Sequence, residues 1–118
     1  MKTRDEIKAA LTSICPNVFY AKATKQPDEY IVWDMDGQQA DALYADEAMD
    51  DQVLSGTIDL FTKKINRDGS SPTFKKIHSA LRAIELSFSL NSKQVERDTG
   101  FTHWEWVFEY VGDEYGND

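Results

Sequence analysis

Cysteine is almost absent from this chain, since Cys15 is the only one among 118 residues. A single thiol excludes an intrachain disulfide, so the fold must depend on a hydrophobic core. The two histidines, His78 and His103, lie far apart, and neither a Cys-x-x-Cys nor a His-x-x-x-His spacing occurs. A phosphate-binding glycine-rich loop is also missing. We therefore expect no metal site and no cofactor.

Long apolar runs are missing as well. No stretch approaches the roughly 20 apolar residues that a membrane-spanning helix needs. The first residues, Met-Lys-Thr-Arg-Asp-Glu, are not followed by the apolar region of a secretion signal. Basic residues are outnumbered 13 to 21 by acidic ones, which gives a net charge of −8. This charge opposes binding to nucleic acid or to anionic membranes, and we expect a cytoplasmic protein.

Apolar material is sufficient for one core, because 41% of the residues are hydrophobic and 12% are aromatic. A chain of this length matches the usual size of one domain. We expect a single domain over residues 1–118 that ends in a flexible acidic tail at about 112–118.

The first half of the sequence predicts one helix and three strands. Thr3 and Glu6 form a capping box, and apolar residues then recur at helical spacing, which predicts a helix over about 3–14 that ends before Pro16. Three further segments are rich in β-forming residues. They predict strands at 18–20, 30–34 and 53–62, with a polar segment at 38–49 that we interpret as a hairpin tip or an arm.

The second half predicts a helix followed by further strands. Ser70 or Ser71 caps this helix, Pro72 fits its first turn, and its apolar stripe is Phe74, Ile77, His78, Leu81 and Ile84. Strands are expected at 86–91, 93–97 and 101–111. With the adjoining segments 86–91 and 93–97 counted in one position, the order is α-β-β-β-α-β-β, which predicts an α+β fold with a mostly antiparallel sheet of about four to six strands. Two helices are expected to pack on one face.

The last strand places Trp104, Trp106, Phe108 and Tyr110 on one face, because side chains alternate along a strand. We expect these rings to form the core face under the helices. A stacking platform for single-stranded nucleic acid would need a basic groove, and the neighbours here are Glu105 and Glu109.

Two motifs invite an enzymatic interpretation. Residues 31–37, Ile-Val-Trp-Asp-Met-Asp-Gly, resemble the opening motif of haloacid-dehalogenase phosphatases, with Asp34 as nucleophile and Asp36 as acid/base. That family needs a doubly wound parallel sheet and a longer chain. The triplet Asp98-Thr99-Gly100 is that of aspartic proteases, but its polar flanks favour a hairpin turn in which the glycine takes a positive φ.

Two isolated residues have ordinary structural interpretations. His78 lies on the apolar stripe of the second helix, where a hydrogen-bonded histidine at the edge of the core is expected. Cys15 follows a helix C-terminus, where the helix dipole disfavours a thiolate. A Cys-His nucleophilic pair has no support from spacing.

The ordered set of segments resembles a known family. The first four segments are residues 18–20 (Val-Phe-Tyr), 30–33 (Tyr-Ile-Val-Trp), 44–46 (Tyr-Ala-Asp) and 56–63 (Gly-Thr-Ile-Asp-Leu-Phe-Thr-Lys). The last segment is Glu96-x-Asp98-Thr99-Gly100-Phe101-x-His103-x-Glu105-Trp106-x-Phe108-Glu109. In this order they resemble the small tail-terminator, or tail-completion, proteins of phages and prophages of Gram-positive bacteria. Such proteins are also described as minor capsid or head-tail joining proteins. The resemblance covers about residues 3–111.

The resemblance implies a non-enzymatic virion protein. It implies a subunit of a homo-oligomeric ring, often of six, that caps the head-proximal end of the tail tube and meets the head connector. The location would be the virion tail, and the host cytoplasm before assembly. No catalytic residue is carried over. Candidate interface residues are the acidic arm and a basic strand end, namely Tyr44, Asp46, Glu47, Asp50, Asp51, Lys63 and Lys64.

Two alternatives remain open from the sequence. One is a small hydrolase or phosphatase that uses Asp34 and Asp36. The other is an unrelated bacterial adaptor domain.

Overall fold

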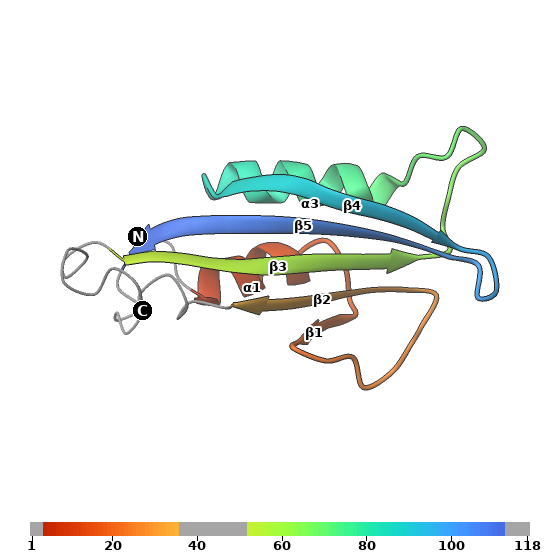
Figure 1. The fold of residues 1–118 in the computed structure, drawn as a ribbon, viewed down its shortest axis with the longest axis horizontal. Coiled ribbons are helices and arrows are strands. Elements are labelled where there is room, and N and C mark those ends of the chain that lie inside the picture. The colour runs from red at the N-terminus through yellow and green to blue at the C-terminus, as the bar shows by residue number, and fades with distance from the viewer. Residues whose placement is uncertain (1–3, 36–51, 113–118) are drawn as a thin grey trace.

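The computed structural model describes residues 4–35 and 52–112 (Figure 1). Their elements are α1 (Arg4–Thr12), β1 (Val18–Tyr20), β2 (Glu29–Met35), β3 (Gln52–Thr62), α3 (Pro72–Ala83), β4 (Ser87–Glu96) and β5 (Phe101–Gly112). The side chains of residues 52–54 and 110–112 are outside the description. The expected order of helices and strands is confirmed.

The strands form one sheet in the order β1-β2-β3-β5-β4. All neighbouring pairs are antiparallel except β1 and β2, which run parallel. Both helices lie behind the sheet in Figure 1 and pack on the same face. The predicted α+β fold is therefore confirmed. The sheet has a helix-covered face and an opposite face, which we call the open face.

The helix ends follow from local sequence. Ser71 caps α3, because its Oγ accepts a hydrogen bond from the Phe74 amide at 3.1 Å, and Pro72 opens the first turn. At the other end, Glu85 takes a φ of 58° and the Leu86 amide returns to the Leu81 carbonyl. This left-handed residue stops the helix and turns the chain into β4. The predicted cap of α1, Thr3, lies outside the described residues.

The core lies between the helices and the aromatic face of β5. Trp106 and Phe108 are fully buried, and Trp104 is 5% exposed. Their partners include Ile7 and Leu11 from α1, Ile31 and Trp33 from β2, Ile58 and Leu60 from β3, and Ile77 and Leu81 from α3. The predicted orientation of β5 is confirmed, apart from Tyr110, whose side chain is not described.

Gly56 makes room for this packing. It pairs with Phe108 across the sheet and with Met35 on the other side. A Cβ at this position would collide with the Asp34 carbonyl oxygen and the Phe108 ring. Any larger residue would therefore force β2 or the Phe108 ring to move.

One sequence expectation is wrong. Segments 86–91 and 93–97 were expected as separate strands, the first half-buried. They form the single strand β4, with an irregularity between Leu90 and Ser92, and Leu90 is 46% exposed. The physical reason is that an edge strand pairs with one neighbour only, and it can accommodate an extra residue while keeping its backbone hydrogen bonds to that neighbour on either side. The turn at Asp98-Thr99-Gly100 is confirmed, with Gly100 at a φ of 82°.

His78 is the satisfied core-edge histidine that the sequence predicts. The Trp106 indole Nε1 donates to His78 Nε2 at 2.9 Å. Phe74 stacks on the imidazole, with 4.6 Å between ring centroids. Because the indole N–H is a donor only, His78 Nε2 must be unprotonated for this bond to exist.

Replacing Trp106 with alanine should lower the free energy of unfolding by about 3–5 kcal/mol, since it removes a fully buried ring and opens a cavity. Trp106→Phe should cost less, because most of the ring volume remains and chiefly the bond to His78 is lost. Chemical denaturation measures both. Val107→Ala, at the neighbouring exposed position, is the control; an equal effect there would contradict the assigned register.

Stability should depend on His78 below neutral pH. Burial, and secondly the charge of Arg82, lower the pKa of His78 from its ordinary value of 6.5. The folded protein therefore binds this proton less readily than the unfolded chain. The resulting loss of stability is absent above the pKa that His78 has in the unfolded chain. It grows as the pH falls from there towards the pKa of His78 in the folded protein. His78→Gln keeps an acceptor for Trp106 and should flatten unfolding free energy against pH over this window. Identical slopes in the two proteins would remove His78 as the cause.

Candidate functional site

A second group of aromatic side chains lies on the open face. Tyr30 of β2, Phe61 of β3 and His103 of β5 are direct cross-strand neighbours. Their rings form a column: Tyr30 stacks on Phe61 with centroids 4.8 Å apart, and Phe61 stacks on His103 at 4.1 Å. Phe101 meets Tyr30 and Phe61 edge-on. The column ties three strands together on the side away from the helices.

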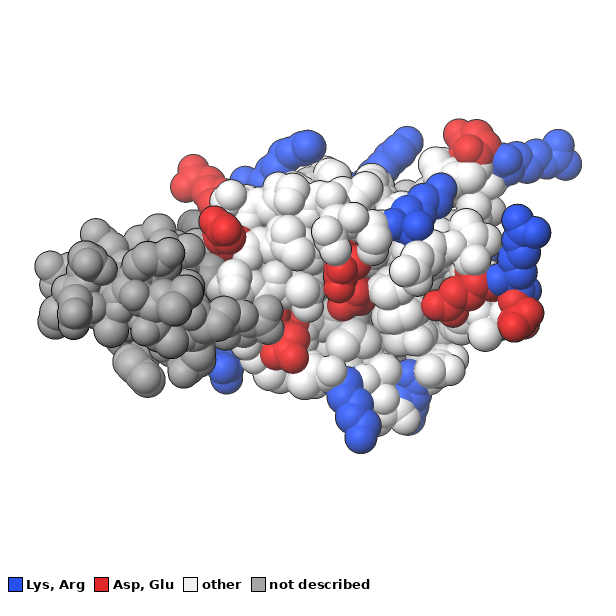
Figure 2. All heavy atoms as spheres, viewed as in Figure 1, with Lys and Arg blue, Asp and Glu red and all other residues white. Residues whose placement is uncertain are grey.

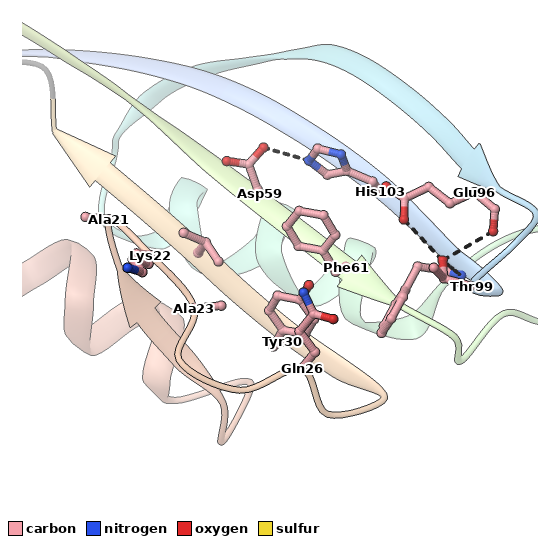
Figure 3. Close-up of a pocket in the computed structure, with 12 residues that line it drawn as sticks. Ala21, Lys22, Ala23, Gln26, Tyr30, Asp59, Phe61, Glu96, Thr99 and His103 are labelled. Carbon is pink, nitrogen blue, oxygen red and sulfur yellow. Dashed lines mark hydrogen bonds and ion pairs between the residues drawn. The ribbon is translucent and has the colours of Figure 1, made fainter.

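His103 is held by a carboxylate. Its Nε2 lies 2.8 Å from Asp59 Oδ1, and both side chains are mostly buried, at 18% and 17% exposure (Figure 3). An ionised carboxylate only accepts hydrogen bonds, so Nε2 is the donor. In the neutral ring, Nδ1 is then an acceptor. The pair is partly shielded from water, which strengthens its hydrogen bond.

These residues line a pocket of about 700 Å³ on the open face. The loop after β1 forms one wall through Ala21, Lys22, Ala23 and Gln26, and the turn between β4 and β5 forms the other (Figure 3). Burial, and secondly the charge of Glu96, raise the pKa of Tyr30. The floor of the pocket thus combines aromatic rings with the Asp59–His103 pair, and Lys22 and Glu96 lie on its walls.

Thr99 and Cys15 are not presented to the Asp59–His103 pair as nucleophiles. The Thr99 hydroxyl is bonded to Glu96 and accepts from the Phe101 amide. Cys15, the remaining thiol, is buried in the core under the helices. Burial is the main reason why the pKa of Cys15 is raised, so desolvation disfavours a thiolate here.

The residues of the phosphatase hypothesis are only partly placed. Asp34 lies on β2 opposite Thr57, and Asp36 is outside the described residues. The sheet is mostly antiparallel, so the doubly wound parallel sheet that this hypothesis requires is missing from the described fold. Asp98-Thr99-Gly100 forms the turn between β4 and β5.

The predicted interface residues divide into two groups. Tyr44, Asp46, Glu47, Asp50 and Asp51 lie outside the described residues. Lys63 and Lys64 follow β3, with their ammonium groups 3.8 Å from Asp28 and 4.0 Å from Glu29 of the same chain. Lys63 also lies over the Phe101 ring, 4.9 Å from its centroid. Both lysines are accessible, but their charges are already opposed within the subunit.

Sequence reasoning missed the Asp59–His103 pair. It places Asp59 on the polar side of its strand and His103 among the odd positions of β5, yet the contact depends on which residues of β3 and β5 face each other. The only available signal was that both residues belong to the face opposite the core.

A scan against models of known protein families and a search of curated proteins both find no match for this chain. Within residues 4–35 and 52–112, no three His, Cys, Asp or Glu side chains are grouped as metal ligands. No helix in the described segments is long and apolar enough to cross a membrane.

The Asp59–His103 contact should contribute to stability rather than stand as a chance surface contact. A double-mutant cycle with Asp59→Ala and His103→Ala should give a coupling of about 1 kcal/mol at neutral pH. Asn91 and Glu105, joined at 2.7 Å but exposed, provide the control cycle and should couple less. Equal couplings would show that partial burial does not strengthen the pair.

Proposed function

We propose that this protein is a non-enzymatic assembly subunit, a tail-terminator or head-tail joining protein that forms a ring at the head-proximal end of a phage tail tube. The proposal starts from the sequence resemblance over residues 3–111. Its partners would be further copies of itself, the tail tube protein and the head connector. The single observation in the structure that supports it best is the distribution of charge.

The excess of acidic residues lies in the sequence outside the described residues. Residues 4–35 and 52–112 contain as many acidic as basic side chains, 12 of each. Segments 36–51 and 113–118 contain six and three acidic residues and no basic ones. Segment 36–51 joins Met35 to Gln52, and 113–118 follows Gly112, which pairs with Gln52. Both acidic segments are therefore attached at the same end.

The described surface has mixed charge. Figure 2 shows lysine, arginine, aspartate and glutamate side chains interspersed over the open face. The opposite end of the sheet holds Lys63 and Lys64, Arg67 and Arg97, together with acidic neighbours. A closed ring is built from heterologous contacts, in which one patch meets a different patch of the next copy. Acidic segments that are attached at one end of the sheet, and mixed charge at the other end, would supply two such patches.

Acidic segments would also suit a conduit for DNA. Phosphates are repelled by carboxylates, so a ring with acidic segments towards its channel would not retain the nucleic acid that passes through.

Native mass spectrometry of the full chain should show a closed oligomer of one size. Reversing charge at the mixed end, with Lys63→Glu and Lys64→Glu together, should shift the population towards the monomer, because acidic segments of a neighbour would then be repelled. The matched control is Lys75→Glu with Lys76→Glu, an equal charge change on α3.

Three outcomes would contradict this proposal. A strictly monomeric chain would remove the self-assembled ring, and equal effects of the two double variants would remove Lys63 and Lys64 as its contact. Phosphatase activity in the unmodified protein, lost in the Asp34→Asn variant, would favour the enzymatic alternative over the assembly role.

A further inference from the structure

β4 forms a long unpaired edge of the sheet. Among the described strands only β5 pairs with it, so the outer side of its ten residues meets no other strand. The opposite edge is β1, with three residues. An edge strand presents a row of free N–H and C=O groups to any strand that approaches.

The composition of β4 does not protect this edge. Leu90 is 46% exposed and Val95 is 62% exposed. Residues 86–92, Leu-Ser-Phe-Ser-Leu-Asn-Ser, carry no charge in a chain of which 29% is charged. Edge strands usually have lysine, proline or inward charges that discourage pairing. The one lysine, Lys93, turns onto the ring of Trp104, 5.4 Å from its centroid.

The irregularity in β4 makes the strand complementary to itself. Before it, Phe88 and Leu90 face the helices, opposite Phe108 and Trp106. After it, Lys93 and Val95 face the helices, opposite Trp104 and Thr102. The extra residue, Asn91, has thus moved the helix-facing positions from even to odd numbers.

This change matters for antiparallel pairing of two copies. A regular strand of ten residues, paired with itself over its full length, would oppose residues of different faces. With the extra residue the faces match along the whole strand. Phe88 of one copy then opposes Val95 of the other, Leu90 opposes Lys93, and Ser89 opposes Gln94. The end residues Ser87 and Glu96 also pair, and no two like charges are opposed.

We propose that two copies of this chain associate through the outer edges of β4, antiparallel and in this full-length register. The contact joins two five-stranded sheets into one continuous sheet across a two-fold axis between Asn91 and Ser92. Val95 is covered by Phe88 of the other copy, and Leu90 by the aliphatic stem of Lys93. The central pair, where the two irregularities meet, contributes no regular ladder bond.

This dimer does not depend on the proposed ring. A ring made of one repeated heterologous contact contains no two-fold axis between neighbours, so the two contacts must use different surfaces. The dimer concerns β4, whereas the ring hypothesis concerns the ends of the strands. If the ring forms and the β4 dimer does not, only the dimer proposal fails. If the dimer forms and the ring does not, only the ring proposal fails.

Sedimentation equilibrium of the full chain in high salt, which screens the charged contacts of the proposed ring, should show a monomer–dimer equilibrium over about 1–500 µM. Val95→Lys should raise the dissociation constant about tenfold or more, because two-fold symmetry places the substitution in the contact twice. The control is Val107→Lys, an exposed valine on β5 that is away from the outer edge. A monomer at all concentrations, or equal effects of the two variants, would overturn the proposal.

The register has a separate test. In the double variant Ser89→Cys with Gln94→Cys, oxidation should produce disulfide-linked dimers, since these positions are opposed in the dimer and too far apart within one strand. The control is the double variant Ser87→Cys with Ser89→Cys, which puts two thiols on the same face of the same strand. In the proposed dimer these two positions do not oppose each other. Equal cross-linking of the two variants, or none with residues 89 and 94, would overturn the register even if a dimer forms.

Discussion

The pairing of β3 with β5 fixes both faces of the sheet at once. It runs without interruption from the Gln52–Gly112 pair to the Thr62–Thr102 pair. On the covered face it sets Ile58 beside Trp106 in the core, and on the open face it sets Phe61 beside His103. A slip of one residue would bury the polar side of β5 and expose its tryptophans. The core and the pocket therefore depend on one register.

Sequence periodicity was sufficient for the elements and for the core face. The aromatic residues at even positions of β5 and the serine–proline start of α3 are local signals, and both have their expected consequences in the structure. The contact between Asp59 and His103 could not be predicted in this way, because it joins residues 44 apart whose alignment is set by the whole ladder. The irregularity in β4 likewise depends on its partner strand.

The lysines after β3 show how structure changes an electrostatic hypothesis. From sequence alone, Lys63 and Lys64 are a free basic patch for a neighbour's acidic arm. In the fold, Asp28 and Glu29 already lie beside them. An acidic segment from another copy would have to displace or share these partners. The exposed Lys63–Asp28 pair contributes about 0–1 kcal/mol, so exchanging it is small in energy. Glu29 is buried and also accepts a hydrogen bond from the Thr62 hydroxyl, so the Lys64–Glu29 pair is not of this kind.

The two proposed self-contacts differ in physical character. The contact at the strand ends is made by charges, and salt screens exposed charges over about 8–10 Å, so this contact should weaken as ionic strength rises. The central part of the β4 edge, residues 86–92, is uncharged, and its contact depends on backbone hydrogen bonds and on covering Leu90 and Val95. Salt does not screen these interactions, and excluded salts such as sulfate strengthen apolar burial. Ionic strength therefore moves the free chain between the two: high salt favours the edge dimer, and low salt favours contacts between the ends of the sheet.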